Sequence, residues 1–382
     1  MKMHVSGGTL VTPNHVLKEH DIIIEQDKIL AILPSQPKSK EYSIDARGMW
    51  VVPGFIDLHI HGSAGFDTMD ATNEAIHGLA NFLVKHGVTS YLPTTIAASA
   101  ERIREVLANI RHCPQPEEGA RHLGLHLEGP YLSSRYRGAQ PFRHIRPVDP
   151  DEYRYWLVGG FPVFMVTLAP EVDGIDGFLK AGTDAGIIFA VGHSEASYEQ
   201  VLAAAELGLS QASHLFNGMP PFHHREPGVV GAVLMDHRIV PQVIVDGVHL
   251  HPAALKLVVK AKGIDKTILI TDATRGAGLK DGDYTLGDQA ITVQNGIART
   301  REGGLAGSTL TMDVAIKNMM EYTGLSLPEA VTMATLTPAV SIGMCGKKGI
   351  LASGADADLV LLDHDCRVRM TMVMGRVVYN DM

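Results

Sequence analysis

The strongest constraint on the fold is an alternation of short apolar runs with helix-like segments through the middle of the chain. Eight runs rich in β-branched residues are separated, in most cases, by helix-like stretches such as 73–86, 99–112 and 252–262. This alternation favours an α/β fold of the (β/α)8 barrel type. A doubly wound open sheet would show the same pattern, so periodicity by itself leaves both architectures open. The runs cover residues 55–60, 88–92, 122–127, 163–168, 187–191, 210–215, 242–246 and 267–271.

The two ends of the chain are β-rich and differ from the middle. Residues 21–33 contain two apolar runs around the polar pair Gln26-Asp27, which predicts a hairpin. Residues 357–380 contain three further β-like runs. We therefore predict a small β-sandwich domain built from residues 1–52 and 346–382, with the barrel of residues 53–345 inserted into it. Within the barrel, the glycine-rich residues 275–306 are expected to form a loop or a hairpin.

Charge and cysteine usage argue against several classes of protein. The chain has 42 acidic and 33 basic residues, a net charge of −9, and so lacks the basic footprint of a nucleic-acid-binding protein. It contains no run of apolar residues long enough for a membrane span, and its N-terminus has no signal-peptide core. The three scattered cysteines form neither a disulfide framework nor a CxxC metal clip. We expect a cytoplasmic protein that binds neither nucleic acid nor membranes.

Residues of metal-ligand type stand where five of the predicted strands end. His59 and His61 are two residues apart, so the alternation of side chains along a strand places both on one side. In a barrel the carboxyl ends of the strands meet at one mouth, where active sites lie. Four histidines and two carboxylates suit one or two divalent ions such as Zn²⁺ or Fe²⁺. The other four residues, on the third, fifth, sixth and eighth strands, are Glu128, His193, His214 and Asp272.

Each of these residues has an ordinary structural explanation when it is taken alone. A buried histidine is often a hydrogen-bonded core residue, Asp272 could cap a helix, and Glu128 could belong to a turn before Gly-Pro. Helix caps and core histidines do not explain why all six residues stand at five strand ends in this order. The pattern therefore predicts a metal-dependent active site at the barrel mouth.

The order of these motifs resembles that of the amidohydrolase superfamily. After PGFID at residues 53–57, six motifs follow one another along the chain: HIHG, HLEGP, GHS, SHLFNGM, DGVH and TDA. Four motifs resemble one family within this superfamily, the N-acetylglucosamine-6-phosphate deacetylases. They are HLEGP, HLFNGM, the REPG that begins at Arg225, and LAGSTLTM at residues 305–312. The similarity covers nearly the whole chain, including the β-rich ends. It implies an amidohydrolase-type barrel with a small β domain.

The resemblance also implies a ligand set. Glu128, His193 and His214 match the ligands of a metal ion that every member of the family keeps. His59 and His61 match a pair that some members use, with Glu128 as a bridge, for a second ion. Other members carry Gln and Asn at this pair and bind one ion, so the two histidines make a binuclear site plausible here.

Further residues match positions that act on the substrate. Asp272 matches the catalytic carboxylate and is also counted among the metal ligands. His249 matches a residue that contacts the substrate and polarises its carbonyl, and Arg225 matches a phosphate-binding arginine. The remaining predicted contacts are Gln140, where other members have His, the backbone of Asn217 and Gly218, and a lining loop of Leu305, Ala306 and Gly307.

The implied reaction is hydrolysis of the acetamide of N-acetylglucosamine 6-phosphate to acetate and glucosamine 6-phosphate. The galacto epimer stays open as a substrate, as does an N-acyl amino acid, which would not need Arg225. A cyclic-amide hydrolase would need a lysine at the end of the fourth strand, where VTLAPE has none. A binding module without activity would usually have lost ligands, and all six are present.

Two further expectations concern specificity and assembly. Arg275 follows the catalytic Asp272 closely, where better-known members have a smaller or apolar residue, so we expect this cation to affect substrate preference. Members of the family are commonly homodimers in which the phosphate-binding arginine reaches the partner's site. The resemblance therefore implies a homodimer with Arg225 at the interface.

Overall fold

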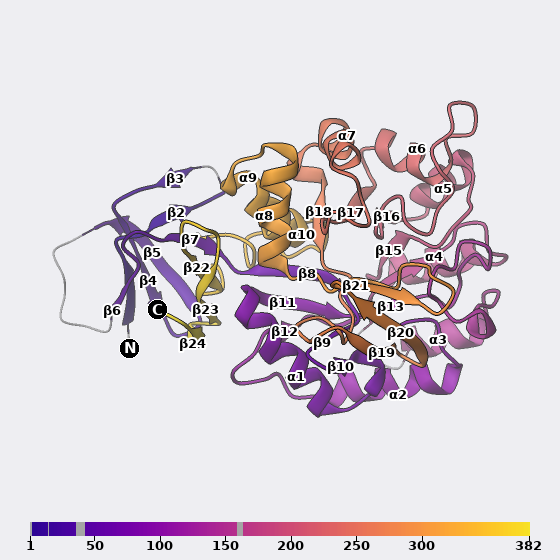
Figure 1. The fold of residues 1–382 in the computed structure, drawn as a ribbon, viewed down its shortest axis with the longest axis horizontal. Helices are drawn as coiled ribbons and strands as arrows, with labels where there is room; N and C mark the ends of the chain where they lie inside the picture. The colour runs from indigo at the N-terminus through magenta and orange to yellow at the C-terminus, as the bar shows by residue number, and fades with distance from the viewer. Residues whose placement is uncertain (1, 14, 36–42, 159–162) are drawn as a thin grey trace.

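The computed structural model describes residues 2–13, 15–35, 43–158 and 163–382, which form a barrel and a smaller β-sheet part (Figure 1). The barrel makes up the right-hand side of the view, and both chain ends lie in the smaller part on the left. Among the described residues, no helix is both long enough and apolar enough to cross a membrane.

The barrel is built from parallel strands in the predicted order. One set of pairings joins β8, β11 and the short β12 (Arg121–His122), and another joins β13 to β18 in sequence order. Two contacts close the ring: the Asp272 N–H donates to the His59 carbonyl at 2.9 Å, and Thr94 bridges to His126. The closed barrel is therefore confirmed over the open sheet. Its strands are β8 (Phe55–Ile60), β11 (Val88–Pro93), β13 (Leu125–Glu128), β14 (Val163–Leu168), β15 (Ile188–Val191), β16 (Leu209–Ala212), β17 (Val240–Ile244) and β18 (Ile268–Ile270).

Helices cover the outside of the barrel and begin at the polar residues that the sequence offers as caps. The Ser99 side chain accepts from the Arg102 N–H at the start of α2, and Ser197 forms a capping box with Gln200 at the start of α5. Strand β8 is buried along its whole length because the barrel interior covers one face and helices the other. The helices are α1 (Asn73–Leu83), α2 (Ala100–His112), α3 (Pro150–Val158), α4 (Ile175–Asp184), α5 (Tyr198–Glu206), α6 (Gly228–Met235), α7 (Pro252–Lys262), α8 (Met312–Thr323), α9 (Leu327–Ala334) and α10 (Leu336–Ser341).

The smaller part draws on both ends of the chain. β4 (His20–Glu25) and β5 (Lys28–Pro34) form the predicted hairpin, and β22 (Leu359–Leu362) pairs antiparallel with β7 (Trp50–Pro53). Residues from both ends share one apolar core, so a small sheet domain made from both termini is confirmed. The domain boundaries after residues 52 and 345 stay predictions. The other strands are β1 (Lys2–Ser6), β2 (Thr9–Val11), β3 (Val16–Leu17), β6 (Ser43–Asp45), β23 (Val368–Val373) and β24 (Arg376–Asn380).

An antiparallel sheet stands beside the barrel mouth, in the glycine-rich region after β18. Strands β19 (Gly282–Leu286), β20 (Gln289–Gln294) and β21 (Ile297–Thr300) pair in that order. The pair β9 (Gly62–Ser63) and β10 (Phe66–Asp67), after the first barrel strand, lies close to it, because the Gly287 N–H donates to the Asp67 carboxylate at 3.0 Å. This excursion supplies one wall of the cavity described next.

Candidate active site

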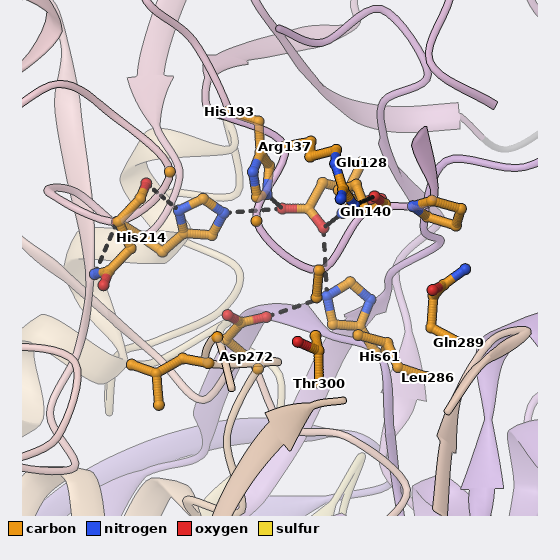
Figure 2. Close-up of a pocket in the computed structure, with 18 of the residues that line it drawn as sticks. His61, Glu128, Arg137, Gln140, His193, His214, Asp272, Leu286, Gln289 and Thr300 are labelled. Carbon is orange, nitrogen blue, oxygen red and sulfur yellow. Dashed lines mark hydrogen bonds and ion pairs between the residues drawn. The ribbon is translucent and has the colours of Figure 1, made fainter. Parts of the chain in front are cut away.

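A cavity of about 740 Å³ opens at the carboxyl ends of the barrel strands (Figure 2). Its walls come from the strand ends, from the segment 137–143 and from the antiparallel sheet beside the mouth. The strand ends therefore meet at one cavity, as predicted. The lining includes most of the predicted site residues: His61, Glu128, Gln140, His193, His214, Asn217, Gly218, His249, Asp272, Leu305 and Gly307.

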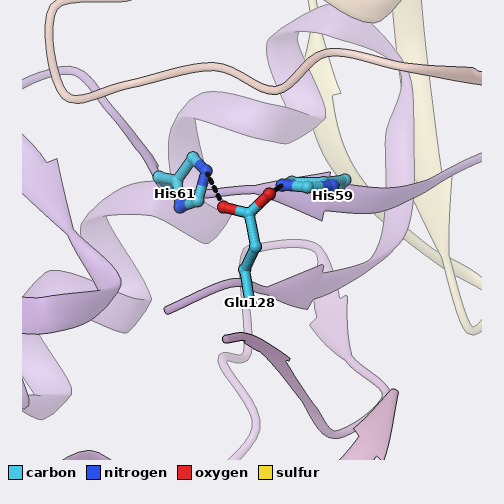
Figure 3. A group of neighbouring side chains, drawn as sticks. All are labelled: His59, His61 and Glu128. Carbon is cyan, nitrogen blue, oxygen red and sulfur yellow. Dashed lines mark ion pairs between the residues drawn. The ribbon is translucent and has the colours of Figure 1, made fainter. Parts of the chain in front are cut away.

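Glu128 is the centre of the buried cluster. Its Oε1 lies 2.9 Å from Nε2 of His214 and 3.2 Å from Nε2 of His193 (Figure 2). The same carboxylate faces Nε2 of His59 and Nε2 of His61, each at 3.4 Å (Figure 3). Two triads with metal-ligand geometry thus share this one glutamate, and all their members are buried.

The ring orientations of three of these histidines suit metal ligation. Nδ1 of His61, His193 and His214 lies 3.2, 3.0 and 3.1 Å, respectively, from a backbone carbonyl. A carbonyl can only accept, so Nδ1 carries a proton, and whenever the ring is neutral the lone pair of Nε2 is the one offered to the cluster. Backbone carbonyls fix the tautomer of metal-bound histidines in the same way.

Three buried atoms of the cluster lack a hydrogen-bond partner. They are both ring nitrogens of His59 and Oδ1 of Asp272, which lies 3.4 Å from His59 and 3.1 Å from His61. A buried polar atom without a partner costs about 1–3 kcal/mol. A divalent cation would satisfy Nε2 of His59 and Oδ1 of Asp272 and would also neutralise the two carboxylates, so the residues present fit a metal site.

Strained backbone brings clustered side chains from three different strands to the mouth. His193, His214 and Asp272 have φ angles of 49°, 31° and 49°, in the left-handed region that residues other than glycine rarely adopt. Such strain costs on the order of 1–3 kcal/mol per residue and gathers at functional sites. Glu171 helps to hold the turn after His193, because it accepts from the Ser194 hydroxyl at 2.7 Å and from the Glu195 N–H at 2.6 Å.

The cluster keeps its carboxylates ionised. Burial opposes ionisation of Asp272, but the nearby His59 and His61 lower its pKa to about 2. The pKa of Glu128 is likewise held well below its ordinary value, against burial, by His59, His193 and His214. The pKa of His61 is raised to about 9, since Asp272 and Glu128 outweigh the effect of burial. Both carboxylates are therefore ionised, the form in which a carboxylate can bind a cation.

Not every predicted contact reaches the cavity. Arg225 lies on an exposed loop, where its guanidinium contacts Nε2 of His224 at 2.8 Å, and it does not line this cavity. Ala306 is buried behind the wall, which its neighbours form. Arg275 also lies outside the lining, because Asp70 at 2.8 Å and Asp67 at 3.4 Å hold its guanidinium. The structure gives no support to the expected effect of Arg275 on the substrate.

Several residues of the site were not predicted from the sequence, Asp246 and Arg137 among them. Asp246 lies 2.6 Å from Nδ1 of His249 and orients that ring at the cavity wall. The three-residue spacing within DGVH could have indicated this pair. Arg137 lines the cavity, and its Nη1 donates to the Gln140 carbonyl at 3.0 Å. Its neighbour Gly138 packs against His193, which no sequence pattern indicated.

Comparisons with known proteins agree with this geometry. The amidohydrolase family model matches residues 50–378. An N-acetylglucosamine-6-phosphate deacetylase of Bacillus subtilis is 40% identical, over 97% of this chain and 95% of its own. An N-acetylgalactosamine-6-phosphate deacetylase of Escherichia coli O157:H7 is 37% identical, over 96% and 97%. The structure of a Mycobacterium smegmatis N-acetyl-D-glucosamine-6-phosphate deacetylase mutant, in complex with N-acetyl-D-glucosamine-6-phosphate, has a TM-score of 0.92 and 34% identity, covering 99% of this chain and 100% of that one.

Proposed function

Because this chain belongs to the amidohydrolase family and, within it, to the N-acetylglucosamine-6-phosphate deacetylases, we propose that it hydrolyses the acetamide of N-acetylglucosamine 6-phosphate. The products are glucosamine 6-phosphate and acetate. One observation carries the proposal: Glu128, His193 and His214 form a buried triad beside Asp272, at the base of a cavity large enough for a sugar phosphate.

The first triad, Glu128, His193 and His214, would hold a divalent ion, and His59 with His61 and Glu128 would hold a second. When bound, such an ion would supply Lewis-acid chemistry, polarising a carbonyl and making water a better nucleophile at neutral pH. Histidine nitrogens with carboxylate oxygens suit Zn²⁺ or Fe²⁺. The unpartnered Nε2 of His59, which faces Glu128 and Asp272, favours two ions per chain over one.

Asp272 is the group we assign to proton transfer. Its lowered pKa keeps it ionised at neutral pH, so it can accept a proton from the attacking water. The same carboxyl group then donates that proton to the departing nitrogen. Its position at the cavity lining puts it within reach of both the water and the amide.

His249 is placed to donate to the carbonyl oxygen as negative charge develops there. Asp246 holds its Nδ1, which leaves Nε2 as the ring nitrogen for the substrate. Burial opposes the charged form of His249, yet Asp246 raises its pKa. One well-placed donor to such an oxyanion is worth about 3–4 kcal/mol.

The phosphate end of the substrate is assigned to the backbone of Asn217 and Gly218. Gly218 packs so closely on His193 that a Cβ there would lie 2.8 Å from Nδ1, so only glycine lets the chain pass. Leu305 and Gly307 also line the cavity. Arg225, which lies outside this cavity, would complete the phosphate site of a partner subunit in a homodimer.

An acetate-release assay tests the proposal. The substrates are N-acetylglucosamine 6-phosphate, its galacto epimer, the two unphosphorylated sugars and an N-acyl amino acid, with metal analysis of the same sample. We expect the gluco phosphate to be hydrolysed fastest. Preference for the galacto epimer would identify the alternative substrate, and hydrolysis of the N-acyl amino acid alone would contradict the proposal.

A further inference from the structure

The side chain of Gln140 is clamped at both ends in the cavity wall. It is 4% exposed, its Oε1 accepts from the Ala97 N–H at 2.7 Å, and its Nε2 donates to Oε2 of Glu128 at 2.5 Å (Figure 2). The backbone N–H of Ala97 can only donate, so it fixes which end of the amide is oxygen. The NH₂ group therefore faces Glu128.

The backbone of Gln140 is held as firmly as its side chain. Its N–H donates to the Arg137 carbonyl at 2.9 Å, and its own carbonyl accepts from Nη1 of Arg137 at 3.0 Å. The amide is thus supported from the segment 137–140 and from Ala97, which follows β11. A donor held in this way has little freedom to follow Glu128 if the carboxylate turns.

Glu128 needs such a restraint because its two oxygens serve different partners. Oε1 faces His193, His214 and His59, whereas Oε2 faces His61. The terminal torsion of a glutamate is broad and roughly two-fold, so the carboxylate plane is not fixed by the side chain itself. Any turn about that bond would misalign both oxygens together.

We infer that Gln140 is a positioning residue for Glu128, which sets how tightly the cluster retains metal, and that it does more than contact the substrate. The inference rests on the proposed function in that it takes Glu128 as a metal ligand. Loss of a partner outside the ligand set typically weakens metal affinity 10–100-fold. We expect a loss of that size when the Gln140 donor is removed.

Two substitutions separate the donor from the bulk of the side chain. Gln140→Met keeps the length but has no N–H to offer Glu128. Gln140→His keeps a donor on one ring nitrogen and an acceptor for the Ala97 N–H on the other. Gln289→Met is the matched control, since Gln289 lines the same cavity and its side-chain amide bonds Asp288 instead.

The experiment measures Zn²⁺ affinity by chelator competition and Zn²⁺ content after gel filtration, for the full-length wild type and the three variants. The thermal midpoint of each metal-free protein reports folding, and acetate release is recorded alongside. We expect Gln140→Met to lose affinity 10–100-fold, and Gln140→His and Gln289→Met to stay near the wild type.

Wild-type affinity in a folded Gln140→Met variant would overturn the inference. If that variant does not fold, Gln140→Ala, which also removes the donor, decides: a 10–100-fold loss of affinity supports the inference, and wild-type affinity overturns it. A wild type that neither binds Zn²⁺ nor releases acetate would instead overturn the proposed function, so the two failures are distinguishable.

Discussion

Asp246 accepts a hydrogen bond from Nδ1 of His249 at 2.6 Å, while the N–H groups of Val248 and His249 donate to its other oxygen at 2.8 Å each. This half-buried carboxylate fixes both the orientation and the tautomer of the imidazole at the cavity wall. Burial works against the charged forms of both groups, yet the pKa of Asp246 is lowered and that of His249 is raised. The pair is therefore an ion pair over a range of pH that includes mildly acidic conditions.

Asp246→Asn should lower the pKa of His249 in a histidine NMR titration, because the variant loses the anion that stabilises the imidazolium. The raised pKa also makes the pair's contribution to stability depend on pH. For His249 this contribution is complete below the ordinary value of 6.5 and is lost as pH rises through the raised value. The lowered pKa of Asp246 adds a contribution that is lost only in strong acid.

Urea unfolding of wild type and Asp246→Asn across this range measures the effect. The difference in the free energy of unfolding should be larger at mildly acidic pH than above the titration of His249. A difference that does not vary with pH, together with an unshifted His249 titration, would contradict the ion pair.

The barrel could be predicted because its strands are buried on both faces and therefore appear as continuous apolar runs. The predicted ends of the strands were less accurate where buried residues continue past the last residue of the strand. The sixth run was placed at 210–215, but β16 ends at Ala212, since the chain turns at His214 with a φ of 31° while Leu215 stays buried. Apolar pattern alone does not report such a turn.

The convergence of Glu128, Asp272 and the four histidines could also be predicted, because parallel strand ends converge wherever a barrel closes. What could not be predicted depends on contacts between loops. The clamp on Gln140 uses the Ala97 N–H, 43 residues away, and Arg225 lies on an exposed loop outside the cavity. Neither position follows from local sequence pattern.

The metal content should exceed one equivalent per chain in protein purified without chelator. His59 has no hydrogen-bond partner on either ring nitrogen, which favours a second ion at His59, His61 and Glu128. His59→Gln should lower the content to about one equivalent and should spare the ion at Glu128, His193 and His214. Elemental analysis of both proteins tests this, and a single equivalent that is unchanged in the variant would refute the binuclear site.

Arg225→Ala should raise KM for the phosphorylated sugar roughly tenfold or more, since a hydrogen bond to a charged group is worth about 1.5–3 kcal/mol. Metal content should not change, because Arg225 does not line the cavity that holds the ligands. Steady-state kinetics with phosphorylated and plain sugars measures the loss. Equal behaviour of variant and wild type on both sugars would show that another group binds the phosphate.

The position of Arg225 outside its own chain's cavity also predicts complementation between subunits. A mixture of Arg225→Ala and Asp272→Asn subunits would contain sites in which an intact arginine faces an intact aspartate. Such a mixture should regain activity that neither variant has alone. If mixing after subunit exchange restores nothing, the arginine does not act across a dimer interface.

Asp272→Asn is the variant that isolates proton transfer. Asn has nearly the same shape as Asp and keeps the backbone N–H that donates to the His59 carbonyl at 2.9 Å, so the barrel should still close. Glu128, His193 and His214 should still bind metal, because their triad does not include Asp272. The amide cannot carry the proton between water and the leaving nitrogen, so kcat should fall by roughly 10²–10⁴, the usual contribution of a positioned acid/base group. Acetate release measures the loss of kcat, elemental analysis measures the retained metal, and calorimetry measures substrate binding. A fall of less than tenfold with metal retained would mean that another group moves the proton, and loss of all metal would assign Asp272 mainly to ligation.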